Sequence, residues 1–141
     1  MRKILLIMIG LSVGLMADFV RDANTGIVTD NTTGLQWQDD AIGASMAWQS
    51  AIDTCENLTL GGESDWRLPN INELKTIIDR SRVKPAIAIA FTQTSSSDYW
   101  SSTTIAYYND SVWLVFFDFG FMGGSAKAND YYYVRCVRAG Q

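Results

Sequence analysis

Cys55 and Cys136 are the only two cysteines among the 141 residues of the chain. An even pair of cysteines in an exported protein is typical of a disulfide, with free thiols and a redox-active pair as the alternatives. Two thiolates alone are too few ligands for a metal site, and the chain has no histidine to complete one. The absence of histidine also excludes histidine-based catalytic triads. We predict a structural disulfide between Cys55 and Cys136.

Four cations lie close together in the sequence, at Lys75, Arg80, Arg82 and Lys84, with only Asp79 against them. In an acidic chain, such a segment can form an electropositive patch for a sulfated or carboxylated glycan. The alternative, which the sequence alone favours, is a solvated helix end where cations suit the helix dipole.

Several tyrosines offer flat rings of the kind that stack on sugars, and we take Tyr107, Tyr108 and Tyr132 as candidates. Adjacent residues of a strand face opposite ways, so at least one tyrosine of the run 131–133 should be exposed. Ordinary sheet packing is the alternative for each of them. The tryptophans are expected in the core, at Trp37, Trp48, Trp66, Trp100 and Trp113.

Carboxylate and amide side chains give only weak indications of a metal site or of a catalytic pair. Asn109 and Asp110 resemble a fragment of a calcium site, although a turn between strands explains them equally well. We expect Asp30-Asn31 and Asp39-Asp40 to be turn and solvated-loop residues. A pair of carboxylates for glycoside hydrolysis would have to lie about 5 or 9 Å apart, and nothing in the spacing argues for one.

Residues 1–17 have the layout of a secretory signal peptide. Arg2 and Lys3 precede an apolar run that is too short for a comfortable membrane span, and the small Ala17 ends the segment. Removing two of the eleven basic residues and none of the fifteen acidic ones would leave residues 18–141 with a net charge of −6. So acidic a domain is not expected to bind nucleic acid, and we expect it in the periplasm or outside the cell.

The pattern of apolar residues predicts a hairpin first, then two helices, then a group of strands. Residues 26–38 read as a hairpin, and a helix is expected over residues 46–58 with Ser45 as its cap. Asn70 begins a second helix, with Glu73 completing a capping box. Three β-prone runs follow, separated by glycines and by the Asn109-Asp110 turn, at residues 99–103, 112–119 and 131–138. The run 112–119 is apolar on both faces and is predicted as a central strand of an antiparallel sheet, which makes the fold class α+β.

Five motifs in this order carry a resemblance to a known family: DNTTGLQWQDD at 30–40, a spaced motif over 48–74 that contains Trp48, Cys55, Gly61-Gly62 and DWRLPN, YWSST at 99–103, VWLVFF at 112–117 and YVRCVR at 133–138. Together they resemble the Lcl C-terminal domain family, named for the C-terminal domain of a bacterial collagen-like adhesin. The resemblance covers essentially all of residues 18–141 and implies a secreted or surface domain with a C-type-lectin-like layout.

In C-type-lectin-like folds, a cysteine on the first helix is bonded to a cysteine on the last strand, and Cys55 and Cys136 occupy these places. The calcium-binding lectins use a Glu/Gln-Pro-Asp/Asn tripeptide, whereas residues 68–70 here read Leu-Pro-Asn. We therefore expect no cofactor. Arg67, Arg135 and Arg138 lie within the motifs, so we expect them to pair with acids such as Asp65 for structural reasons.

The named adhesin binds sulfated glycans as a trimer with a collagen-like stalk. This chain has no Gly-x-y tract, so the resemblance leaves its oligomeric state open. We expect a non-catalytic binding or adhesion module that recognises a glycan or another envelope ligand. The alternatives are a structural protein–protein interaction domain of the cell envelope and a hydrolase.

Overall fold

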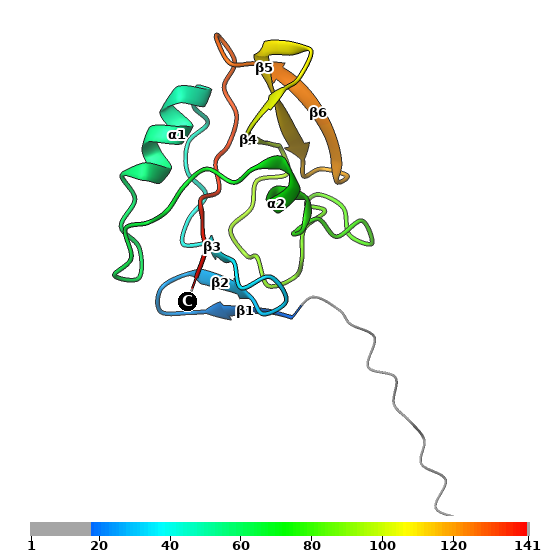
Figure 1. Ribbon diagram of the computed structural model, residues 1–141. Helices are drawn as coiled ribbons and strands as arrows, with labels where there is room; N and C mark the ends of the chain where they lie inside the picture. The colour runs from blue at the N-terminus through cyan, green and yellow to red at the C-terminus, as the bar shows by residue number, and fades with distance from the viewer. Residues whose placement is uncertain (1–17, 141) are drawn as a thin grey trace, which may run out of the picture.

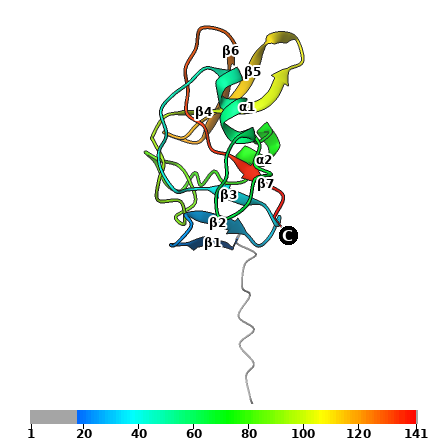
Figure 2. The same cartoon turned by 90° about the vertical axis from the view of Figure 1, so that its left-hand side faces the viewer.

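The computed structural model describes residues 18–140, and the expected signal peptide lies outside this range. Two antiparallel sheets and two helices make up the fold, as the α+β prediction requires (Figure 1). The strands within residues 19–38 lie at one end of the molecule and those within residues 98–126 at the other in both ribbon views (Figures 1 and 2). The last strand, at residues 137–138, joins the sheet of residues 19–38, which lies nearer the C-terminal label in Figure 1.

The first sheet has the strand order β1-β2-β3-β7. The predicted hairpin is present as β2 (Ile27–Asp30) and β3 (Gln36–Gln38), which pair antiparallel with Val28 opposite Trp37. The sequence did not indicate β1 (Phe19–Asp22), which pairs with the outer side of β2. The hairpin turn is closed by Asp30, whose buried carboxylate accepts hydrogen bonds from the backbone of Thr32 and the hydroxyl of Thr33.

The second sheet has the order β4-β5-β6, with bounds Asp98–Ile105, Tyr108–Phe116 and Phe121–Ala126. β5 is its central strand, as predicted. Two expectations are wrong here. Asn109 and Asp110 do not form the turn, which lies at residues 106 and 107; they belong to β5. Gly123 and Gly124 do not interrupt the sheet, because they lie inside β6.

Both helices are shorter than the pattern suggested. α1 (Trp48–Glu56) begins after Ala47 and has no side-chain cap, so the assignment of Ser45 is wrong. Met46 instead forms a β-bridge with Tyr132, which holds the preceding backbone extended. α2 (Ile71–Lys75) has the predicted capping box between Asn70 and Glu73. No helix in residues 18–140 has the length and apolar character needed to cross a membrane.

The last stretch of chain, residues 131–138, is the clearest departure from prediction. Only β7 (Val137–Arg138) is a strand, and it joins the first sheet beside β3 rather than the second. The residues before it hydrogen-bond in turn to Met46, to Trp100 in β4 and to Gln38, the last residue of β3. The segment therefore ties several elements together instead of extending one ladder.

The core is divided into two clusters, and residues 131–138 contribute to both. Val137 and Tyr133 pack in the cluster of Trp37, Leu74 and Phe117. Alternate residues of the same segment, including Cys136, pack in a cluster with α1. The alternation of side chains along an extended backbone explains how one segment serves both clusters.

Trp113 does not belong to either cluster and remains partly exposed, contrary to expectation. It lies opposite Gly124 in β6, which has no side chain to cover its ring. Trp37, Trp66 and Trp100 are buried as predicted, and Trp48 is half-buried.

Candidate functional site

Four of the nine cations in residues 18–140 are neutralised by a carboxylate. Ion pairs are formed by Arg21 with Asp39, Arg67 with Glu73, Arg135 with Asp39, and Arg138 with Asp65 and Glu63. The expected structural pairing of the motif arginines is thus confirmed, including the pair with Asp65. These side chains hold the fold together and are not free to bind a ligand.

Asp39 is the centre of a buried polar network. Its carboxylate accepts hydrogen bonds from Arg21 at 2.7 Å, from Arg135 at 2.9 Å and from the backbone N–H groups of Thr92 and Gln93. Burial alone would raise its pKa, but these donors and the Arg135 charge outweigh burial and hold the pKa below its usual value. The prediction that Asp39 lies in a solvated loop is wrong, because its side chain is fully buried.

The cations left without an ion pair in the described residues are Lys127 and the four of the predicted basic segment. Lys127 is held by the carbonyl of Asn109 at 2.8 Å and lies over the ring of Trp48. The side chains of the segment are all exposed, at Lys75, Arg80, Arg82 and Lys84. Four of the five unpaired cations of the described residues thus lie exposed within residues 75–84, and we call the surface that they form the basic face.

Local packing holds two of these side chains in place. The Nε of Arg80 donates to the carbonyl of Gly120 at 3.1 Å, so its guanidinium is oriented while the two terminal nitrogens stay available. Gly120 has a positive φ of 81°, and a Cβ there would press against the Arg80 stem. The Lys84 amine lies 5.7 Å from the centre of the Phe119 ring.

Asp79 is the one acid within the segment. Its carboxylate accepts from the hydroxyl of Ser81 at 2.6 Å and from the Ser81 backbone, and these bonds lower its pKa. It therefore stays ionised and turned toward its own loop, and reduces the net charge of the basic face without cancelling it.

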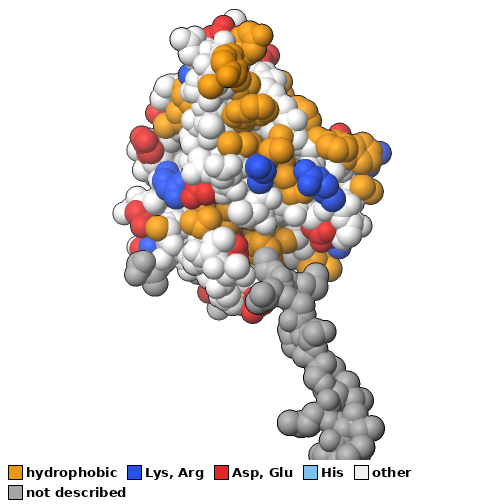
Figure 3. Space-filling model, turned by 45° about the vertical axis from the view of Figure 1, so that its right-hand side comes forward, with side chains coloured by type: hydrophobic (Ala, Val, Ile, Leu, Met, Phe, Trp, Pro, Cys, Tyr) orange, Lys and Arg blue, Asp and Glu red, His pale blue; other side chains and the backbone are white. Residues whose placement is uncertain are grey.

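A cavity of about 430 Å³ opens on the basic face. Its wall includes Arg80, Thr76, Ser81, Asp79 and the exposed Ile89. Figure 3 shows Lys and Arg side chains on this side of the molecule with hydrophobic side chains between and beside them. The wall mixes the Arg80 guanidinium with the carboxylates of Asp18 and Asp79, with hydroxyls and with an apolar surface, and such a combination of polar and apolar groups suits a sugar ring.

The tyrosine candidates are not brought to this cavity. Tyr107 and Tyr108 lie at the tip of the β4–β5 hairpin, at the top of Figure 1, and Tyr107 is 91% exposed. Tyr132 packs edge-on against Trp100 at 4.8 Å, and its hydroxyl lies 3.1 Å from Ser125. We therefore remove Tyr132 from the candidate site. The prediction of an exposed tyrosine among residues 131–133 is confirmed by Tyr131.

The weak calcium candidates do not converge. Asn109 and Asp110 are exposed neighbours in β5, and the Lys127 amine occupies the carbonyl of Asn109. Residues 18–140 contain no group of three His, Cys, Asp or Glu side chains that could hold a metal ion. A second cavity, of about 230 Å³, lies on the first sheet beside Thr29, Gln36 and Glu63, where Gln36 and Glu63 are already bonded to Arg138.

The sequence profile described as the Lcl C-terminal domain matches residues 26–138. The protein belongs to the Lcl C-terminal domain family. No curated protein matches the chain. The match spans every strand except β1, both helices and the basic face of this Lcl C-terminal domain, so the resemblance seen in the motifs is confirmed.

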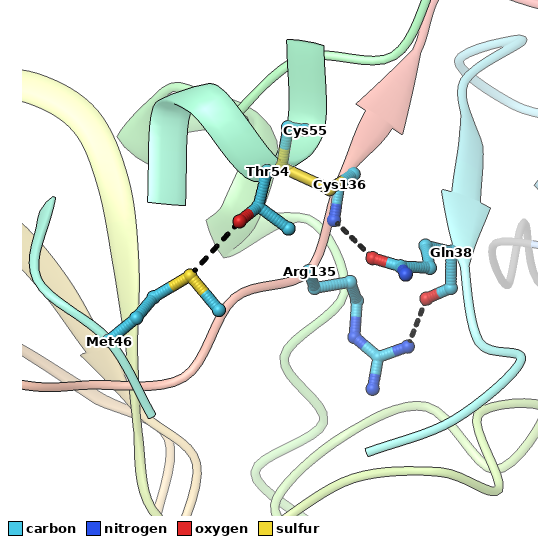
Figure 4. Close-up of a disulfide and its surroundings, with 6 residues drawn as sticks. All are labelled: Gln38, Met46, Thr54, Cys55, Arg135 and Cys136. Atoms are coloured by element: carbon cyan, nitrogen blue, oxygen red, sulfur yellow. Dashed lines mark hydrogen bonds between the residues drawn. A yellow bond between two sulfur atoms is a disulfide. The ribbon is translucent and has the colours of Figure 1, made fainter. Parts of the chain in front are cut away.

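The disulfide of the Lcl C-terminal domain joins Cys55 at the end of α1 to Cys136 before β7, with the two Cα atoms 5.4 Å apart (Figure 4). Gln38 accepts the Cys136 N–H through its side chain and the Arg135 guanidinium through its carbonyl. The bridge thus fixes α1 to the segment that carries Arg135. A disulfide is consistent with an exported protein, and the family is bacterial.

Sequence reasoning found the basic segment of the Lcl C-terminal domain but not the cavity beside it. Ile89 was not singled out, and neither was Phe119, which lies under Lys84. Ile89 lies outside every predicted element, and Phe119 ends the predicted strand 112–119 but lies beyond β5; the two are exposed at 76% and 45%. An apolar residue outside the predicted elements is the signal that could have marked Ile89.

Proposed function

We propose that the protein is an exported, non-catalytic binding module of C-type-lectin-like layout that recognises an anionic glycan on the basic face. The ligand would carry sulfate or carboxylate groups, and binding would require no metal. The observation that carries the proposal is the distribution of charge. Four of the five cations without an ion pair in residues 18–140 lie exposed within residues 75–84, and one of them, Arg80, lines the cavity.

Arginine and lysine contribute differently to such a site. A guanidinium offers two parallel donors to a sulfate or carboxylate, whereas an ammonium acts as a point charge. Arg80 is already oriented by the Gly120 carbonyl, so it loses little freedom on binding. Lys75, Arg82 and Lys84 are exposed and add long-range attraction, which is weakened by salt.

Apolar side chains complete the site. Ile89 in the cavity wall and Phe119 beside Lys84 are both exposed. Sugar rings have apolar faces, so contacts with these side chains would favour a glycan over a simple anion. These apolar contacts would distinguish the site from a charged patch that binds only small counterions.

The test is the affinity for sulfated dextran, with unsulfated dextran as the ligand control. Replacing Lys75, Arg80, Arg82 and Lys84 with alanine removes four exposed contacts of about 0.2–1 kcal/mol each, so affinity should fall by roughly fourfold to several hundredfold. Lys127→Ala serves as the control, because this cation lies outside the basic face. A chelator should change nothing. Unchanged affinity of the fourfold variant in low salt would remove the basic face from the account.

The hairpin tip offers a second surface for the same function, through the exposed rings of Tyr107 and Tyr108. The double variant Tyr107→Ala/Tyr108→Ala separates the two surfaces, because the tip and the basic face lie in different parts of the molecule (Figure 1). We expect this variant to bind sulfated dextran like the wild type. Loss of binding here, with retention in the fourfold variant, would move the site to the tip.

A hydrolase would be most plausible at Asp98 and Asp118. Burial and the neighbouring Asp118 charge raise the pKa of Asp98, which is the kind of shift a carboxylic acid catalyst uses. The basic face is formed by other residues, and we propose that the ligand is bound without being cleaved. Sulfated dextran recovered at unchanged length after long incubation would agree; shortening that Asp98→Asn abolishes would contradict it.

A further inference from the structure

The outer edge of β6 is unusual among the sheet edges of this protein. β4 is covered on its outer side, because its backbone hydrogen-bonds to Tyr133 and to the carbonyl of Pro69. β7 is covered by Arg67, which exchanges two backbone hydrogen bonds of 2.9 Å with Val137. β1 carries two charged residues, Arg21 and Asp22. β6 contains no charged residue, and no element of residues 18–140 pairs with its outer side.

The register with β5 shows which backbone groups of β6 are free. The Lys127 N–H donates to the Asp110 carbonyl. In an antiparallel ladder every second residue pair exchanges hydrogen bonds, so the hydrogen-bonded pairs are those two, four and six positions before Lys127 on β6. Residues 121, 123 and 125 therefore bond inward to β5. The N–H and C=O groups of Met122, Gly124 and Ala126 point outward, and all three residues are exposed.

Side-chain packing makes this edge flat. A Cβ on Gly123 would lie 2.3 Å from the ring of Phe116, and a Cβ on Gly124 would lie 2.4 Å from Ile105. The two glycines are thus required because side chains from β5 and from the end of β4 lie over them. The consequence is a strand whose centre presents backbone alone, without the lysine, proline or bulge that usually protects an edge.

We propose that β6 pairs antiparallel with β6 of a second copy of this chain, forming a continuous six-stranded sheet around a two-fold axis at Gly124. This register uses every outward N–H and C=O of residues 122, 124 and 126. It places Met122 opposite Ala126 of the other copy, on the face that also holds the exposed Trp113. A shift of the axis to residue 123 or 125 would leave one of the three outward residues opposite a position beyond the other strand.

Charge favours a second copy at this edge over the others. Residues 18–141 carry a net charge of −6, so two copies repel each other wherever acidic side chains meet. β6 contains no charged residue, and its neighbouring exposed side chains are apolar, at Phe121, Met122 and Trp113. Pairing here buries these side chains without opposing like charges. The basic face lies on other residues and stays free.

Sedimentation equilibrium of the purified protein over a range of concentrations tests the proposal. The wild type should form dimers as concentration rises. Met122→Lys/Ala126→Lys places lysine opposite lysine across the axis and should give a monomer. Met122→Lys/Ala126→Glu places lysine opposite glutamate and should restore the dimer. Both variants alter the same exposed positions, so circular dichroism should show the same fold.

Hydrogen exchange gives a second measurement that does not depend on the variants. In dilute protein, the amides of residues 122, 124 and 126 should exchange much faster than those of residues 121, 123 and 125. At high concentration this alternation should disappear. A wild type that stays monomeric at millimolar concentration, or two lysine variants with the same association as the wild type, would overturn the proposal.

Discussion

Arg135 donates to a carboxylate oxygen of Asp39 at 2.9 Å, and both side chains are buried although 96 positions separate them in the sequence. The same guanidinium donates to the carbonyl of Gln93 at 2.7 Å and lies over the ring of Phe91. One ion pair thus joins the end of the first hairpin, the loop before β4 and the segment that precedes β7.

Removing one partner of this pair should destabilise the protein strongly. Asp39→Ala leaves the Arg135 charge buried without a partner, and we expect a loss of about 3–5 kcal/mol in the free energy of unfolding. Arg67→Ala is the control, because the Arg67–Glu73 pair is 45% exposed at the arginine and should be worth about 1 kcal/mol or less. Urea titration measures both. Equal losses in the two variants would show that burial does not strengthen the Asp39 pair.

The same carboxylate predicts a dependence of stability on pH. The pKa of Asp39 is lower in the folded chain than the value of about 3.9 expected when unfolded. Its contribution is therefore present in full above that value and is lost as pH falls toward and through the folded pKa. Unfolding midpoints measured between pH 7 and pH 2.5 should fall in acid, and less steeply in Asp39→Asn. A slope identical in wild type and variant would contradict this assignment.

The disulfide should be structural and should resist labelling. With no reductant, thiol reagents followed by mass spectrometry should modify neither Cys55 nor Cys136. Replacing both with serine removes a crosslink across 81 positions and should cost about 2–5 kcal/mol in the free energy of unfolding. Labelling of both cysteines in the exported protein would contradict the bridge.

The N-terminus of the exported protein tests the predicted signal peptide. Cleavage after Ala17 should give a chain that begins at Asp18, which mass spectrometry of the secreted or periplasmic protein identifies directly. A variant with Ala17 replaced by a bulky residue such as tyrosine should be processed poorly. Recovery of the chain with Met1 and residues 2–17 intact would show that the segment is retained.

The elements that the sequence predicted well are those encoded by nearby residues. The hairpin turn at Asp30 and the capping box of Asn70 and Glu73 depend on contacts within a few positions. β6 was missed because Gly123 and Gly124 usually end a strand. Here they are needed by Phe116 and Ile105, which come from other strands, and no local pattern reports that need.

Candidate site residues divide in the same way. The cluster of cations from Lys75 to Lys84 is visible in the sequence because its members are neighbours. The burial of Asp39 is not visible in the sequence. Asp39 and Asp40 are adjacent and identical, and only the folded chain shows that Arg135 and Thr92 bond to Asp39. Likewise, the contact between the Tyr132 hydroxyl and Ser125 could not be predicted, because Ser125 lies in β6, which the sequence did not indicate.

The most direct test of the proposed function is to map a bound ligand on the wild-type protein by amide chemical shifts. On titration with a sulfated oligosaccharide, the account predicts the largest changes at residues 75–84 and around Ile89 and Phe119, with little change at Tyr107 and Tyr108. The unsulfated oligosaccharide should cause far smaller changes at the same positions. Shifts confined to the hairpin tip or to the cavity on the first sheet, or no shifts at all, would contradict the account.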